Sequence, residues 1–130
     1  MSRGLRNCNP GNIRISNTKF SGEVISNDKS FKQFKNMAYG YRAMMKIIKY
    51  YYGHYNLKTV SEIINRWAPP IENNTSAYVM RVCKETGLNP TDEVYVDNEC
   101  VLCSVVAAMS LVENGVRADM VEVKKGWGLL

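Results

Sequence analysis

The sequence lacks a long apolar segment and an apolar leader. No run approaches the roughly 18 apolar residues that a membrane-spanning helix needs. The first twelve residues, MSRGLRNCNPGN, contain no apolar core of the kind found in secretory signal peptides. We therefore expect no membrane insertion, and any location outside the cytoplasm would require a route other than a cleaved signal peptide.

Several catalytic signatures are also missing. The chain contains no G-x-S-x-G, no Walker loop and no H-E-x-x-H sequence, so it lacks the usual marks of serine hydrolases, P-loop proteins and zinc peptidases. A nucleophilic triad that needs a histidine has only His54 to use.

Cysteines are few and unevenly spaced. Of Cys8, Cys83, Cys100 and Cys103, only the last two form a close pair, whereas zinc sites usually show two close pairs. We expect free cysteines in the core, with a disulfide as the alternative. We expect no metal and no organic cofactor.

The composition is that of an ordinary globular domain. The 130 residues suit a single domain, and they are 45% hydrophobic and 22% charged. A net charge of +5 favours polyanions such as nucleic acid or an acidic cell wall without choosing between them. Eight tyrosines fit grooves for carbohydrate and for single-stranded nucleic acid equally well.

Hydrophobic spacing and end signals predict one mainly helical domain. The predicted helices run over about 37–52, from a Thr59 capping box to Pro69-Pro70, from the polar turn at 72–75 to Gly87, and from an Asp97 cap to Gly115. Residues 4–14 should form a loop. Short strands are predicted over 20–25 and 30–34, with a further strand-like stretch at 94–96.

Glu113 is the first candidate for chemistry. At about 100° per residue, Leu102, Val106, Met109 and Glu113 point in nearly the same direction. An acid that continues an apolar stripe, next to the negative end of a helix dipole, is favoured in its protonated form. A protonated carboxyl near neutral pH is what a general acid requires. The alternative is a helix-end glutamate that reaches solvent or pairs with an arginine.

Glu72 is the second candidate. It lies just ahead of a predicted helix start, where free backbone N–H groups and the helix dipole favour the charged form. Two carboxyl groups pushed in opposite directions resemble the acid and base of glycoside hydrolysis. The alternative for Glu72 is an exposed residue that caps the helix.

Five segments, which together span nearly the whole chain, resemble a group of small phage-borne lysozyme-like proteins: GLRNCNPGNIR, FSGEV, FKQFKNMAYGYRAM, NRWAPPIENNTSAYVMRV and AAMSLVENG. The first three are also similar to the asparagine-rich segment and β-hairpin of flagellar and autolysin glucosaminidases. ENNTSAYVMRV is similar to the E-T-x-x-Y-V segment of soluble lytic transglycosylases. The resemblance implies a lysozyme-like helical domain with a small β-hairpin, and we expect the protein to be a monomer.

The resemblance also implies an activity and its residues. The expected reaction is cleavage of peptidoglycan glycan strands, as by a muramidase or lytic transglycosylase, with Glu113 as acid and Glu72 as base or charge stabiliser. Tyr78, Asn74 and Thr75 would line the groove. Asn9 and Asn12 would hydrogen-bond the sugar or, alternatively, brace a structural loop. The protein would act in a phage virion, or in the periplasm or cell wall after delivery by a non-classical route, where virion proteins or a secretion apparatus would be partners.

One departure suggests a rearranged chain. In the larger families the catalytic glutamate ends a helix upstream of the asparagine-rich segment, whereas here only Met1 to Leu5 precede that segment. A circular permutation would explain the order, provided that the N-terminus lies near the end of the Glu113 helix.

Two other functions stay open. A non-enzymatic virion or cell-wall-binding protein could keep the fold without the chemistry. A basic nucleic-acid-binding domain would need Lys and Arg gathered on one face. Interspersed acids and the missing helix-turn-helix pattern argue against it, so we expect no nucleic-acid partner.

Overall fold

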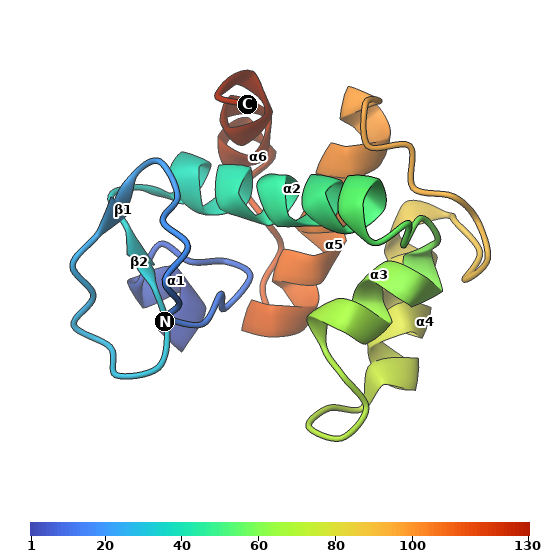
Figure 1. Cartoon of the computed structure of the whole chain (residues 1–130), viewed down its shortest axis with the longest axis horizontal. Helices are drawn as coiled ribbons and strands as arrows, with labels where there is room; N and C mark the ends of the chain where they lie inside the picture. Colours follow the sequence, from blue (N-terminus) through green and yellow to red (C-terminus); the bar gives the residue numbers. More distant parts are fainter.

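The computed structural model describes all 130 residues and is mainly helical, as predicted, with one small antiparallel sheet (Figure 1). The elements are, in order, α1 (Arg3–Arg6), β1 (Glu23–Val24), β2 (Gln33–Phe34), α2 (Met37–His54), α3 (Val60–Trp67), α4 (Thr75–Thr86), α5 (Glu99–Asn114) and α6 (Met120–Gly128). No helix is both long and apolar enough to cross a bilayer.

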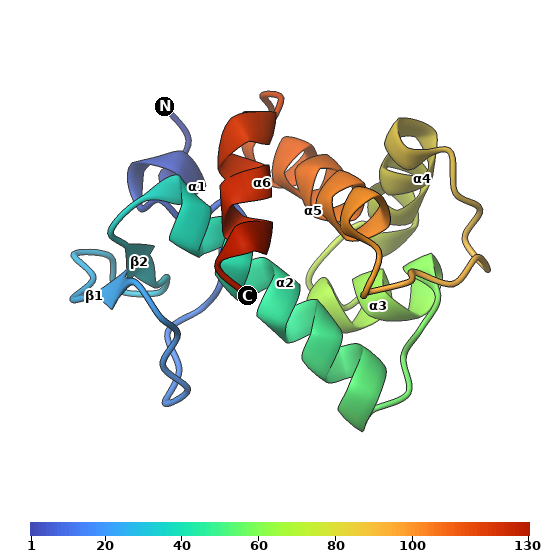
Figure 2. The same ribbon diagram turned by 90° about the horizontal axis from the view of Figure 1, so that it is seen from above.

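Helix α2 runs across the molecule and carries much of the core. Asn36 caps its start by accepting a hydrogen bond from the Tyr39 backbone N–H at 3.2 Å. Met44, Met45 and Ile48, at helical spacing on one face, are completely buried. Helix α6 lies along the first half of α2 (Figure 2).

Helix α5 packs between α4 and α6 (Figure 2). Leu102, Val106 and Met109 are completely buried, which confirms the predicted apolar face. The N-cap is Asn98 and not Asp97, because the Asn98 side chain accepts a hydrogen bond from Val101 N–H while Asp97 is exposed. Gly115, in the left-handed region at φ 74°, ends the helix where predicted.

Helices α3 and α4 follow their end signals closely. The Thr59 capping box is present, with Thr59 and Glu62 each accepting a hydrogen bond from the other's backbone N–H. Gly87 ends α4 at φ 77°. The stretch at 94–96 is not a strand: Val94 and Val96 are buried, but only an isolated bridge between Thr59 and Glu93 forms beside them.

The N-terminal lobe, residues 1–36, departs most from prediction. Residues Arg3–Arg6 form α1, capped by Ser2, where only loop was expected. Both strands are shortened to two residues, although they pair antiparallel as a hairpin. The lobe is instead organised by Lys32, whose completely buried ammonium group binds the Ser16 and Thr18 carbonyl oxygens and the Glu23 carboxylate.

All four cysteines are free in the structure. Cys103 is buried, but Cys100 is exposed, which corrects the prediction that the cysteines all belong to the core. Cys100 lies in the first turn of α5, where one face of the helix meets solvent. No cluster of three or more His, Cys, Asp or Glu side chains is placed to hold a metal ion.

Candidate functional site

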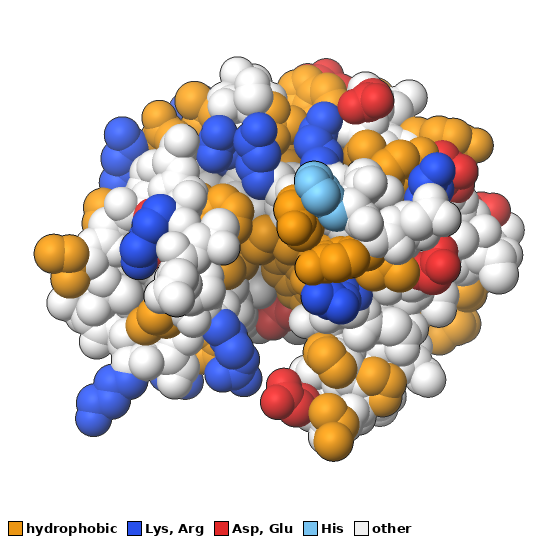
Figure 3. Space-filling view, in the orientation of Figure 1, with side chains coloured by type: hydrophobic (Ala, Val, Ile, Leu, Met, Phe, Trp, Pro, Cys, Tyr) orange, Lys and Arg blue, Asp and Glu red, His pale blue; other side chains and the backbone are white.

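Glu113 lies in the last turn of α5, where two neighbouring cavities meet. The first, of about 360 Å³, is bounded by the N-terminal lobe, α2, α3 and the α3–α4 loop. The second, of about 540 Å³, runs between α4 and the end of α5. Glu113 and Asn73 line both, and we call the combined space the Glu113 cleft. Figure 3 shows this face hollowed between the N-terminal lobe and α3–α4, with acidic atoms at the bottom.

Two side chains from distant parts of the sequence hold the Glu113 carboxyl group. Tyr78 Oη, on α4, donates a hydrogen bond to Oε2 at 3.0 Å, and Asn12 Nδ2 donates to Oε1 at 2.9 Å. A carboxylate has about four acceptor positions. Asn12 and Tyr78 use two of these positions, and the others on this half-buried carboxyl group remain open to a ligand in the cleft.

Tyr78 is built to remain a donor. Its side chain is buried, and burial together with the neighbouring Glu113 carboxyl group raises the pKa of the Tyr78 phenol well above its ordinary value. The phenol therefore keeps its proton at neutral pH, so it orients the carboxyl group rather than accepting a proton from it.

Asn12 reaches Glu113 because the N-terminal segment is fixed to the end of α5. Ser2 Oγ donates to Asn114 Oδ1 at 2.7 Å, and Asn114 Nδ2 donates to the Pro10 carbonyl at 2.9 Å. Gly4 lies in this junction, where an added Cβ would come within 2.5 Å of Asn114 Oδ1. Asn12 itself adopts the left-handed region at φ 50°, which asparagine tolerates better than most residues.

Glu72 lines the first cavity together with Glu113. It belongs to the α3–α4 loop and is exposed, with its backbone N–H bound to the Pro69 carbonyl. It does not cap α4, since Asn74 accepts the hydrogen bond from Ala77 N–H at 3.2 Å. The two carboxyl groups named from the sequence therefore share one cavity.

The other predicted contact residues fall in different places. Asn74 lines the second cavity. Thr75 does not line the Glu113 cleft, because its buried hydroxyl donates to the Ala68 carbonyl and faces a smaller cavity beyond the start of α4. Asn9 is completely buried and binds the backbone of Ile13 and Lys32 through both ends of its amide. Asn9 thus braces the loop, as the alternative interpretation held, and presents no group to a ligand.

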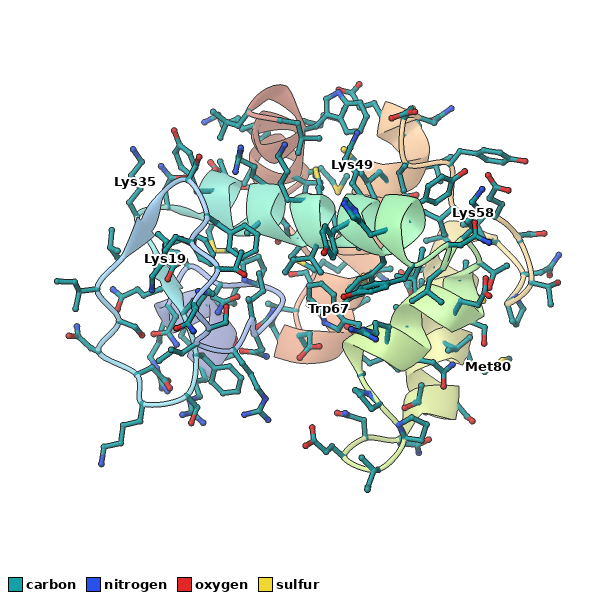
Figure 4. All side chains as sticks on the ribbon, viewed as in Figure 1. Lys19, Lys35, Lys49, Lys58, Trp67 and Met80 are labelled. Carbon is teal, nitrogen blue, oxygen red and sulfur yellow. The ribbon has the colours of Figure 1, made fainter.

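Aromatic and basic side chains that the sequence did not single out also line the cleft. Trp67, at the end of α3, packs against Gly11 and stands edge-on to Tyr51 with ring centroids 6.5 Å apart. Figure 4 shows Trp67 pointing toward the centre of the molecule below α2. On the opposite wall, the Arg14 guanidinium lies over the Phe31 ring at 5.2 Å. The only sequence signals were an aromatic residue just before Pro69-Pro70 and a cation beside the asparagine-rich segment.

Comparison with known proteins shows a similarity to a phage protein. No protein-family model matches the sequence. The chain is 36% identical over 134 residues to Protein P5 of Pseudoalteromonas phage PM2, in an alignment that covers 98% of this chain and 82% of that protein. Identity of this level over nearly the whole length establishes a common family.

Proposed function

Starting from the fact that the chain belongs to the family of Protein P5 of Pseudoalteromonas phage PM2, we propose that this phage-type protein cleaves the glycan strands of peptidoglycan. The relative's name states no activity, so the proposal depends on the cleft. On this proposal the protein acts in the virion, or in the periplasm or cell wall after delivery by a non-classical route.

The observation that carries the proposal is the setting of Glu113. A carboxyl group that ends an apolar helix face lies at the meeting point of two cavities, held by Tyr78 and Asn12 and with Glu72 in the same cavity. Glycoside cleavage needs one positioned acid and either a second carboxylate or a group of the substrate as nucleophile. Aromatic rings such as Trp67 and Tyr51 suit sugar faces.

In the proposed mechanism, protonated Glu113 gives its proton to the glycosidic oxygen as the bond to the departing sugar breaks. The resulting carboxylate then takes a proton from the incoming nucleophile. If that nucleophile is the muramic 6-hydroxyl, the product is a 1,6-anhydro ring, as in lytic transglycosylases. If it is water, the product is a reducing end, and Glu72 has one of two roles: it stabilises the oxocarbenium-like transition state while Glu113 takes the proton of the water, or it takes that proton in place of Glu113, which then regains a proton from solvent.

The N-terminal junction supports the proposed rearrangement of the chain. The hypothesis requires the N-terminus to lie near the end of the Glu113 helix. Ser2 and Asn114 are joined by a 2.7 Å hydrogen bond, which meets that condition. The asparagine-rich segment thus lies beside Glu113 in the fold, although Asn12 precedes Glu113 by 101 residues in the sequence.

Digestion of purified sacculi tests the proposal. We expect wild-type protein to release muropeptides and Glu113→Gln to lose that release by a factor of about 10² to 10⁴, the usual contribution of a general acid. The matched control is Glu99→Gln, an exposed glutamate at the other end of the same helix, which should retain activity. Mass spectrometry distinguishes the two products, because an anhydro muramic end is lighter by one water. Equal release by wild type and Glu113→Gln would refute the assignment of the acid.

A non-catalytic virion or wall-binding protein is the second candidate. It is favoured by the fact that both oxygens of Glu113 already accept hydrogen bonds from the protein, as a purely structural carboxylate would. If this alternative holds, neither the wild type nor Glu113→Gln releases muropeptides. Both would bind intact sacculi equally well in a pull-down assay.

A further inference from the structure

A third cavity, which we call the basic groove, continues from the Glu113 cleft. It lies between residues 13–21 of the N-terminal lobe and the outer face of α2, with a volume of about 680 Å³. Ile13 and Ile47 line both this groove and the first cavity of the Glu113 cleft. A long ligand bound at Glu113 therefore has a path into the basic groove.

The basic groove carries positive charge and no acid. Lys19, Arg42 and Lys46 line it, whereas no Asp or Glu does. Lys46 is exposed and forms no ion pair. Lys19 makes only an exposed 3.4 Å contact with Glu23, a carboxylate that is already bound to the buried Lys32. Figure 3 shows a row of Lys and Arg side chains along this rim, and Figure 4 places Lys19 on the lobe beside α2.

Aromatic side chains complete the groove. Phe20 lies on the lobe side, and Tyr50 and Tyr55 lie at its far end with their rings edge-to-face at 5.5 Å. The two tyrosines are exposed although they are large, but one face of Tyr50 is stacked on His54 and one face of Tyr55 is covered by the Arg66 guanidinium, so each offers a ligand its hydroxyl group and the remaining ring surface. The groove thus suits an otherwise uncharged polymer to which anionic groups are attached.

We propose that the basic groove is a subsite for the peptide branches of peptidoglycan, whose free carboxylates bind Lys19, Arg42 and Lys46 while the glycan lies in the Glu113 cleft. This inference rests on the proposed function and narrows its substrate to strands that still carry their peptides. With a glycan of neutral sugars alone, Lys46 would have no partner, Lys19 only its exposed contact with Glu23, and Arg42 only the Leu129 carbonyl that its Nε binds at 3.0 Å. The carboxylates of the peptide branches supply the charges that the groove lacks.

The groove favours this occupant over nucleic acid. The basic groove holds cations and no acid, whereas the Glu113 cleft on the same path holds two carboxyl groups, Glu72 and Glu113, beside the cations Arg14 and Arg81. A polyanion with a charge at every residue would meet both acids along that path. A glycan whose charges lie only on its branches would not.

Binding measurements with defined glycans test the subsite. We would use the full chain with Glu113→Gln, so that the ligand is not consumed, and titrate it with peptide-bearing glycan strands and with the same strands after an amidase has removed the peptides. Peptide-bearing strands should bind about tenfold more tightly, since exposed ion pairs each contribute modestly. The Lys19→Gln/Lys46→Gln variant should remove most of that difference. The control, Lys29→Gln/Lys84→Gln, changes the same net charge at exposed positions outside the cavities described and should leave it intact.

Three outcomes would overturn the inference. Equal binding of both ligands, with Glu113-dependent cleavage of the stripped strands, would remove the subsite and leave the proposed function standing. Tighter binding of a single-stranded oligonucleotide than of the peptide-bearing glycan, again dependent on Lys19 and Lys46, would assign the groove to nucleic acid. Absence of binding by either glycan, together with no release from sacculi, would remove both the subsite and the function.

Discussion

Replacing Glu23 by glutamine should destabilise the protein strongly, although Glu23 lies outside the Glu113 cleft. Its carboxylate is the only anionic partner of Lys32, whose side chain is completely buried, and both Glu23 oxygens lie within 3.1 Å of the ammonium nitrogen. Breaking a buried pair costs about 3–5 kcal/mol, because one charge is left without compensation. Glutamine keeps one acceptor oxygen, and the Thr18 carbonyl still binds Lys32 at 2.8 Å, so we expect about 3 kcal/mol.

The pH dependence of stability gives an independent check. Burial alone would raise the pKa of Glu23, but hydrogen bonds from Lys32 and the Phe20 backbone N–H hold it below its ordinary value of 4.5. A carboxyl group whose pKa is lower in the folded state stabilises the protein above its unfolded pKa, and that stabilisation is lost as the pH falls through the folded pKa. As the pH is lowered past about 4.5, the free energy of unfolding of the wild type should therefore decrease, and that of Glu23→Gln should decrease less steeply.

Urea denaturation monitored by circular dichroism measures both effects. The matched control is Glu122→Gln, which removes an exposed 3.5 Å pair with Lys125 and should change the free energy of unfolding by less than about 0.5 kcal/mol. Because Asn9 binds the Lys32 carbonyl, hydrogen exchange in residues 9–13 should also accelerate in Glu23→Gln. A loss as small as that of the control would refute the idea that the buried pair organises the N-terminal lobe.

Three further substitutions test the cleft itself. Tyr78→Phe removes the hydrogen bond to Glu113 and should lower both stability, by about 1.5 kcal/mol, and muropeptide release, whereas Tyr95→Phe at an exposed position should change neither. Glu72→Gln should abolish release if water is the nucleophile and leave anhydro product formation largely intact if the muramic hydroxyl is, so product masses from this variant identify the mechanism. Gly11→Ala would place a Cβ 2.7 Å from the Trp67 ring, so it should lower the free energy of unfolding, measured by thermal denaturation, by about 1–3 kcal/mol. The control Gly128→Ala has open space around the added Cβ and should be neutral. Tolerance of Gly11→Ala would show that Trp67 is free to move.

Features of the fold that depend on residues close together in the sequence could be predicted. The Thr59 capping box, the left-handed glycines at 87 and 115, and the buried face of α5 each depend on residues within a turn or two. Where neighbours compete, the local rules were less decisive. Asp97 and Asn98 both suit an N-cap, and in the structure it is the Asn98 side chain that accepts the hydrogen bond from Val101 N–H.

The geometry of the candidate site could be predicted only in part, because its residues come together only in three dimensions. Placing Glu113 at the end of an apolar stripe required helical periodicity alone. Its contacts with Asn12 and Tyr78 join residues 101 and 35 positions apart, and no local pattern reports them. Asn9 and Asn12 look equivalent in the sequence, yet one is completely buried in backbone hydrogen bonds and the other reaches the acid. Asn9 is directed by the Ile13 and Lys32 backbone, whereas the segment that carries Asn12 is held against α5 by the hydrogen bond from Asn114 to the Pro10 carbonyl.

The junction between Ser2 and Asn114 has a consequence for how the protein is made. Chain synthesis proceeds from the N-terminus, so the asparagine-rich segment leaves the ribosome long before α5 exists. The cleft obtains its acid and its N-terminal wall only when residues 112 positions apart meet, which is among the last contacts that a growing chain can form. A nascent or truncated chain therefore has no assembled site, and any activity against a cell wall begins only after the whole domain has been synthesised.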